Sequence, residues 1–152
     1  MTKENNNLTA DADLSLLAYC GLYCGACSFK VAAMENNRKH LSNIPAKYDY
    51  LKNMELKECP GCRNDNKCGD CKIKSCAVEK KIVYCGECDE YPCQLIKNFA
   101  SDGIEHHKNI LKNIEKIRKI GIEQWLLEEK KVYKCGCGKL LSWYAKDCIH
   151  ND

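Results

Sequence analysis

The chain has 152 residues, 14 of them cysteines, and its 24 basic and 21 acidic side chains give a formal net charge of +3. This length fits one compact domain or two very small ones. A mixed, mildly basic composition gives no strong argument for a nucleic-acid or membrane partner. No stretch of about 20 mostly apolar residues is present, so no membrane-spanning helix is expected.

The start of the chain is polar and rich in asparagine, and it lacks the basic and apolar segments of a secretory signal. We therefore expect a cytoplasmic protein. In a reducing compartment, clustered cysteines are better interpreted as metal ligands or redox groups than as a disulfide framework.

The first elements in chain order are a tail and two helices. Residues 1–18 are expected to form a flexible tail, although its leucines could dock on the body. Ser28 is placed to cap a helix that runs to about Leu41. Pro45 suits the first turn of a second helix.

The segment 59–93 contains eight cysteines and few large apolar residues. Such a segment cannot bury enough apolar surface to offset the entropy lost when it becomes ordered. Bound metal is the simplest agent that could hold it. A short strand is expected within it at residues 81–84.

Three helices are predicted after this segment. Pro92 opens the first, which ends at Asp102–Gly103, and an isoleucine face marks a longer helix that ends at Gly121. The third ends near Lys131. The second and third of these helices carry the conventional apolar core pattern of the chain, and Trp125 is expected to be a core residue.

Three Cys-x2-Cys pairs lie between residues 59 and 88, and each contains a glycine. A tight turn of this kind directs two sulfurs at one ion, so three pairs with flanking cysteines are strong evidence for metal. The alternative is a redox dithiol of thioredoxin type, which needs one pair at a helix start in a βαβ context that the sequence does not offer. The predicted ligands of this segment are Cys59, Cys62, Cys68, Cys71, Cys76, Cys85, Cys88 and Cys93.

The C-terminal group combines a Gly-rich Cys-x-Cys at 135–137 with a Cys-x-His that begins eleven residues after Cys137. Two ligands in a turn, a short hairpin and a second ligand pair are typical of a zinc ribbon. The predicted ligands are Cys135, Cys137, Cys148 and His150, the last of which could equally be a frayed end.

The first group is Cys20, Cys24 and Cys27, which leaves one coordination position to be filled from a distance. The same spacing holds an iron–sulfur cluster in radical S-adenosylmethionine enzymes, but their barrel is larger than this chain. Cys59–Pro60 resembles the Cys-Pro that often closes a [4Fe–4S] site. Zinc with three local and one distant thiolate fits equally well.

These motifs together resemble a cysteine-rich family of bacteria and archaea described only as a domain of unknown function. The resemblance runs from about Ala18 to Cys148 and implies no activity. The matching motifs are Cys20-Gly-Leu-Tyr-Cys24-Gly-Ala-Cys27, Cys59-Pro-Gly-Cys62-Arg63, Cys71-Lys-Ile-Lys-Ser-Cys76-Ala and Cys85-Gly-Glu-Cys88-Asp-Glu-Tyr-Pro-Cys93.

We interpret the chain as a small, metal-stabilised α+β protein: an irregular Cys-rich core with several helices over 19–131 and a zinc-ribbon-like hairpin over 132–152. The predicted function is binding of several metal ions, predominantly zinc. An iron–sulfur redox protein or enzyme using Cys20, Cys24 and Cys27 is one alternative, and a zinc-ribbon adaptor for nucleic acid or protein is another. No reaction is identified. The expected grouping places Cys59 and Cys62 with Cys71 and Cys76, and the first group near the cysteines at 85, 88 and 93.

Two further features favour a structural interpretation. Adjacent helical side chains do not face each other, so His106 and His107 are expected on a helix surface. Trp125 and Trp143 are expected to anchor the core rather than to stack on bases.

Overall fold

The computed structural model describes residues 14–57, 61–63 and 71–149. Within these residues the chain is built from helices, with no β-strand and three isolated antiparallel bridges. None of the described helices is long and apolar enough to cross a bilayer. The α-helices are α1 (Ser28–Glu35), α2 (Lys72–Lys80), α3 (Gln94–Ala100), α4 (Ile110–Ile120) and α5 (Ile122–Val132). The 3₁₀ helices are η2 (Leu14–Leu16), η3 (Cys24–Ala26), η4 (Arg38–Leu41), η5 (Ala46–Asn53), η6 (Cys85–Glu87) and η7 (Glu105–Asn109).

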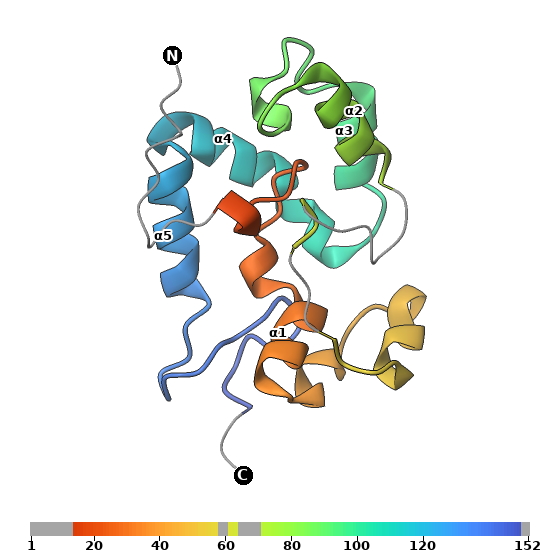
Figure 1. Ribbon diagram of the computed structural model, residues 1–152, viewed down its shortest axis with the longest axis vertical. Helices are drawn as coiled ribbons and strands as arrows, with labels where there is room; N and C mark the ends of the chain where they lie inside the picture. The colour runs from red at the N-terminus through yellow and green to blue at the C-terminus, as the bar shows by residue number, and fades with distance from the viewer. Residues whose placement is uncertain (1–13, 58–60, 64–70, 150–152) are drawn as a thin grey trace.

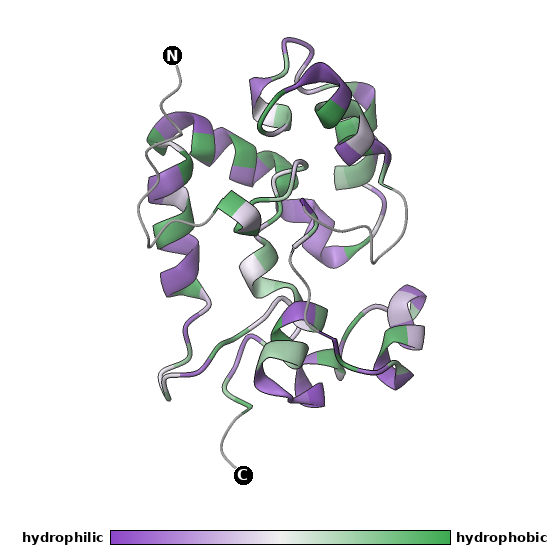
Figure 2. Ribbon diagram, in the orientation of Figure 1, coloured by the Kyte–Doolittle hydropathy of each residue, from purple (hydrophilic) through white to green (hydrophobic). Residues whose placement is uncertain are grey.

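The principal hydrophobic core lies where the N-terminal segment meets α4 and α5 (Figure 1). Helix α4 has one apolar face, visible as alternating green and purple in Figure 2. That face buries Ile110, Ile114 and Ile117, and α5 adds the fully buried Trp125. The expected isoleucine face and the Trp125 anchor are therefore confirmed. Gly121 separates the two helices with φ of +89°, a backbone conformation that favours glycine.

A smaller core lies below, between α1, η4 and η5, and is formed by Phe29, Ala32, Leu41 and Ile44. The predicted helix from Ser28 to Leu41 is interrupted there. Asn36 adopts a left-handed conformation (φ 51°) and its N–H caps the carbonyls of Ala32 and Ala33, which ends α1. The helix predicted after Pro45 is present as the 3₁₀ helix η5.

The predicted tail reaches the core at its C-terminal end. Leu17 is fully buried, and Leu14 and Leu16 pack against the same core. Residues 1–13 lie outside the described part of the chain.

The β component of the expected α+β fold is not found in the described residues. The strand predicted at 81–84 is a turn, because Lys81 ends α2 with a positive φ and the N–H of Val83 bonds to the carboxylate of Glu87. The amides of this segment therefore have local partners instead of a neighbouring strand.

The C-terminal hairpin is likewise replaced by isolated bridges, one of which joins Lys134 and Leu140. Beyond the short contact with the first arm, its second arm bonds to the segment in and just before α1. The N–H of Trp143 donates to the carbonyl of Ala26 at 2.8 Å, and the N–H of Leu140 donates to Glu35 Oε2 at 2.8 Å. The N–H groups of Leu140 and Trp143 are therefore not available for a longer β-ladder between the two arms.

Arg63 ties the separate cysteine motifs together. Its guanidinium donates from Nε to the carbonyl of Leu17 at 3.0 Å and from Nη2 to the carbonyl of Val83 at 2.6 Å. It also lies over the ring of Tyr19, 4.1 Å from the centroid. One side chain thus fixes the second cysteine motif against the segments that carry Cys20 and Cys85.

Candidate metal centre

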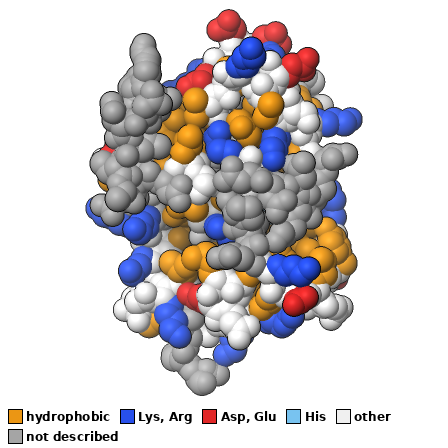
Figure 3. Space-filling view, viewed as in Figure 1, with side chains coloured by type: hydrophobic (Ala, Val, Ile, Leu, Met, Phe, Trp, Pro, Cys, Tyr) orange, Lys and Arg blue, Asp and Glu red, His pale blue; other side chains and the backbone are white. Residues whose placement is uncertain are grey.

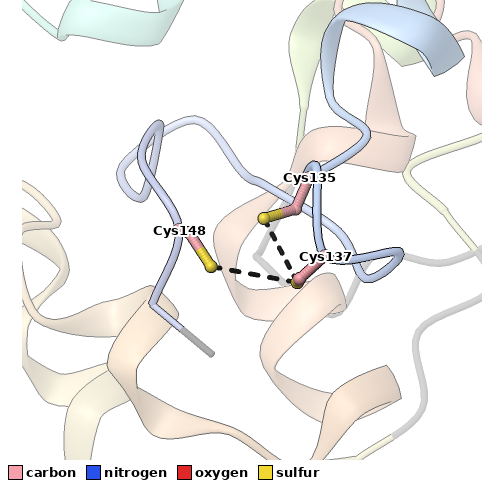
Figure 4. Close-up of side chains that lie close together, drawn as sticks. All are labelled: Cys135, Cys137 and Cys148. Carbon is pink, nitrogen blue, oxygen red and sulfur yellow. Dashed lines mark hydrogen bonds between the residues drawn. The ribbon is translucent and has the colours of Figure 1, made fainter. Parts of the chain in front are cut away.

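Three cysteines from the C-terminal segment bring their sulfur atoms together (Figure 4). Sγ of Cys137 lies 3.3 Å from Sγ of Cys135 and 3.8 Å from Sγ of Cys148. These separations are too long for a disulfide, whose S–S bond is about 2.05 Å. Among the described residues, this is the one group of three or more His, Cys, Asp or Glu side chains whose ligand atoms all lie within 4.8 Å of one another.

A tight turn after α5 presents the first two of these sulfurs. The N–H of Gly138 donates to the carbonyl of Cys135, and the N–H of Cys135 donates to the carbonyl of Lys139. Gly138 has φ of +99°, which explains why glycine stands at this position. The sequence prediction that Cys135, Cys137 and Cys148 converge is thus consistent with the geometry, whereas His150 lies outside the described residues.

The crowded thiols make ionisation of this group unfavourable without a cation. A backbone hydrogen bond from Cys137 lowers the pKa of Cys135, but the neighbouring thiols of Cys137 and Cys148 outweigh it and raise the pKa to about 11. A divalent cation would reverse this effect, because each thiolate would then face a positive charge.

A buried polar network that the sequence analysis missed holds the arm leading to Cys148. His40 is fully buried, with Nε2 2.8 Å from Glu35 Oε1 and Nδ1 2.9 Å from Ser142 Oγ. Ser142 in turn bonds to Ser28, whose hydroxyl accepts the N–H of Tyr144. A Ser–His–Glu series of this kind suggests a hydrolase triad. Ser142 is fully buried, however, so this series fastens the arm to α1.

Four further cysteines line one cavity of about 230 Å³ between α2, η6 and α3, and none of them forms a disulfide; they are Cys76, Cys85, Cys88 and Cys93. Sγ of Cys88 accepts a hydrogen bond from Lys80 Nζ at 3.2 Å and from the N–H of Glu90 at 3.4 Å. Burial raises the pKa of Cys85 to about 12, and the nearby thiols of Cys93, Cys76 and Cys88 contribute to the increase. Helix α2, which places Cys76, was not predicted from the sequence.

The turn that presents Cys85 and Cys88 occurs twice in the molecule. Both Tyr23–Cys27 and Tyr84–Cys88 read Tyr-Cys-Gly-x-Cys, and both form a 3₁₀ turn in which the second cysteine N–H bonds to the first cysteine carbonyl at 3.1 Å. In both turns the buried tyrosine folds over the glycine. A Cβ atom on Gly86 would lie 2.3 Å from the Tyr84 ring, and one on Gly25 would lie 2.5 Å from the Tyr23 ring.

The sulfur atoms of Cys20, Cys24 and Cys27 do not converge as those of Cys135, Cys137 and Cys148 do. Cys24 is almost fully buried, while Cys20 and Cys27 line a separate, larger cleft together with Cys62 and Cys71. Burial raises the pKa of Cys20 well above its usual value, and the thiols of Cys62, Cys71 and Cys85 add to the increase. Cys59 and Cys68 lie outside the described residues.

The cavities agree with the expected grouping in part: Cys62 and Cys71 line one cleft, but Cys76 does not line it. Cys76 lies in the cavity with Cys85, Cys88 and Cys93, whereas Cys71, which precedes α2, lines the cleft with Cys20 and Cys62. The reason is helix α2, which separates Cys71 from Cys76 by more than one turn.

The side chains of His106 and His107 do not lie on an exposed helix surface, contrary to the sequence prediction. His107 is buried, and its Nδ1 lies 2.9 Å from Asp102 Oδ2. His106 stacks on Trp143 with ring centroids 4.2 Å apart, and its Nδ1 lies 2.7 Å from the hydroxyl of Tyr144. Both side chains line the larger cleft, because η7 is a short 3₁₀ helix enclosed by α3 and the C-terminal segment.

The fold and the sulfur geometry define a helix-rich, cysteine-rich protein with a candidate thiolate metal site. The chain belongs to DUF3795, a family whose description is "protein of unknown function" and whose model matches residues 16–98. The matched range is shorter than the resemblance expected from the sequence, and the C-terminal cysteines lie beyond it. No curated protein and no solved structure matches the chain.

Proposed function

We propose that this protein binds several metal ions through cysteine thiolates, and that zinc is the predominant metal. The observation that carries the proposal is the convergence of the Cys135, Cys137 and Cys148 sulfurs at the end of a fastened arm. Three thiolates from a Gly-rich turn and a following segment are typical ligands of structural zinc.

The four-cysteine cavity supports a second site in the same protein. Four cysteines line one small cavity, and four thiolates are the ligand set of a closed tetrahedral zinc site. No three of their sulfur atoms lie within 4.8 Å of one another, so a zinc ion would have to draw them together. The two N–H donors on Sγ of Cys88 would lower the net negative charge of such a site, because each bond withdraws charge from the sulfur. Lys80 would add a formal positive charge beside it.

Zinc at these positions would be coupled to folding. The segment from α2 to α3 buries few large side chains. Ile96 is one of them and is almost fully buried. Chelation should therefore unfold this segment while α4 and α5 retain helical structure. Metal thiolates persist in reducing compartments, which supports a cytoplasmic location for the protein.

A second candidate function is an iron–sulfur redox role in the larger cleft. The observation that favours it is that cysteines from three different motifs, Cys20 and Cys27, Cys62, and Cys71, line the same cleft. Cys20 and Cys27 of the set expected from the spacing are among these residues, whereas Cys24 does not line the cleft. Sulfur ligands drawn from different motifs can hold a [4Fe–4S] cluster as well as zinc.

Elemental analysis of reduced protein, prepared once in air and once without oxygen, distinguishes the two candidates. Zinc bound in proportion to protein in both preparations is the expected result. Iron with acid-labile sulfide and a brown colour, present only in the anaerobic preparation, would support the iron–sulfur candidate instead. Absence of tightly bound metal from both would overturn the proposed function.

A further inference from the structure

A second functional feature is the larger cleft, which has a volume of about 690 Å³ and lies between the two hydrophobic cores. Pockets of about 300–1,000 Å³ with mainly apolar walls and a few converging polar groups are the usual form of small-molecule sites. The walls here come from η5, α1, α3, η7 and the C-terminal segment. Their aromatic side chains include Phe29, Tyr48, Phe99, Trp143 and Tyr144.

Polar groups meet on one side of this cleft and are held rigidly. His107 lies between the Phe99 ring, at a centroid distance of 3.8 Å, and the Asp102 carboxylate. His106 lies between Trp143 and the Tyr144 hydroxyl. Each imidazole is thus fixed both by a stacked ring and by a hydrogen bond, so the pocket wall is formed in advance of any ligand.

The charge that lines the cleft is predominantly positive. Lys47 contributes from η5, and Lys72 and Lys74 contribute from the first turn of α2. That turn contains no acidic side chain and receives no side-chain cap from Cys71, so its N–H groups add to the positive field. Among the described residues that line the cleft, Asp102 is the one acidic side chain, and it faces His107.

The charged side chains on one face of the molecule are spread over its surface. Among the described side chains on the face shown in Figure 3, lysine and arginine are scattered between apolar and acidic ones rather than arranged in one continuous stripe. A long polyanion would need such a stripe, whereas a small anion needs only a local concentration of charge.

We propose that the cleft binds a small organic anion that carries a planar ring. The ring lies among the aromatic walls, and the anionic group faces the lysines at the start of α2. This site is distinct from the two thiolate sites of the proposed function, although Cys20, Cys27, Cys62 and Cys71 form another part of its lining.

The test uses reduced, metal-loaded protein and the fluorescent probe 8-anilinonaphthalene-1-sulfonate, whose rings are planar and whose sulfonate is anionic. Titration by fluorescence and by calorimetry should give saturable binding at one site per chain. The neutral analogue N-phenyl-1-naphthylamine, which lacks the sulfonate, should bind more weakly. Higher salt should weaken the sulfonate probe more than the neutral analogue.

A charge-matched pair of variants locates the binding. The double variant Lys72→Ala/Lys74→Ala should weaken the dissociation constant of the sulfonate probe about fivefold and leave the neutral analogue unchanged. The control Lys112→Ala/Lys119→Ala removes the same charge from α4, away from the cleft, and should bind the probe as the wild type does. Equal affinity in both double variants, or binding that is not saturable, would overturn the proposal.

Metal content measured on the same samples separates the two proposals. If probe binding fails while zinc stays bound, the inference about the cleft is wrong and the proposed function is unaffected.

Discussion

The ammonium group of Lys80 lies 3.2 Å from Sγ of Cys88 and 3.5 Å from a carboxylate oxygen of Glu90. Lys80 comes from the last turn of α2, whereas Cys88 follows the η6 turn. The hydrogen bond to Cys88 raises the pKa of Lys80, so the lysine is fully charged beside the sulfur at neutral pH. A permanent cation is therefore adjacent to the proposed four-thiolate site.

Replacing this lysine should weaken metal binding at the cavity. We expect Lys80→Ala to raise the dissociation constant for zinc at that site by about threefold, because the pair is exposed and screened by solvent. Competition with a chromophoric chelator measures the change. Lys119→Ala, an exposed lysine on α4, is the control, and an equal change in both variants would show that Lys80 has no specific role.

The two Tyr-Cys-Gly-x-Cys turns should not tolerate a side chain on their glycine. In Gly86→Ala the new Cβ would meet the ring of Tyr84, which is buried and cannot move aside without opening the core. The free energy of unfolding should fall by about 1–3 kcal/mol. Gly136→Ala is the control, because nothing lies within 4 Å of the added atom. Urea denaturation of both variants provides the comparison, and equal stabilities would contradict the described turn.

The buried network around His40 should stabilise the C-terminal arm. Ser142→Ala removes the partner of His40 Nδ1 and of the Ser28 hydroxyl, which should lower the free energy of unfolding by about 1–3 kcal/mol. Hydrogen exchange should also become faster over 140–149. The exposed Ser75→Ala on α2 serves as the matched control. If exchange in the arm is unchanged by Ser142→Ala, the network does not fasten it.

Burial of His106 should make stability depend on pH. Burial lowers the pKa of His106 to about 3, with a further decrease from His107, whereas the ordinary value in the unfolded chain is about 6.5. Between these values the unfolded state binds one more proton, so stability is lost as the pH falls below about 6.5. At pH 5 the loss from this group should be about 1–2 kcal/mol.

The variant His106→Gln isolates this contribution, because the thiols that also respond to pH are the same in both proteins. Urea denaturation at pH 7.5 and pH 5 should show a smaller pH-dependent loss in the variant than in the wild type. An identical loss in both proteins would mean that His106 is accessible to protons in the folded state.

The elements with strong local signals could be predicted from the sequence. The isoleucine spacing of α4, the stop at Gly121 and the approach of Cys135 to Cys137 each depend on residues close together in the chain. Features that depend on distant segments could not. Helix α2 is one example, because a cysteine-rich composition conceals the apolar contacts of Ile73 and Ala77.

The grouping of ligands was unpredictable for the same reason. Spacing indicates which cysteines share a turn, but Arg63 and the bond from the Cys85 N–H to the Tyr19 carbonyl decide which turns meet. The burial of His40 also arises from a contact with a distant segment, through Ser142, and that of His107 arises from stacking on Phe99 and the hydrogen bond to Asp102. The periodicity of apolar residues within a helix does not indicate such contacts.

The most direct test of the central claim is native mass spectrometry of reduced, oxygen-free protein, with the double variant Cys135→Ser/Cys137→Ser beside the wild type. The wild type should carry zinc at more than one site, and the variant should retain its fold and carry one ion fewer per chain. A wild-type protein that is folded without any metal, or a variant with an unchanged metal content, would contradict the assignment of these cysteines as a metal site.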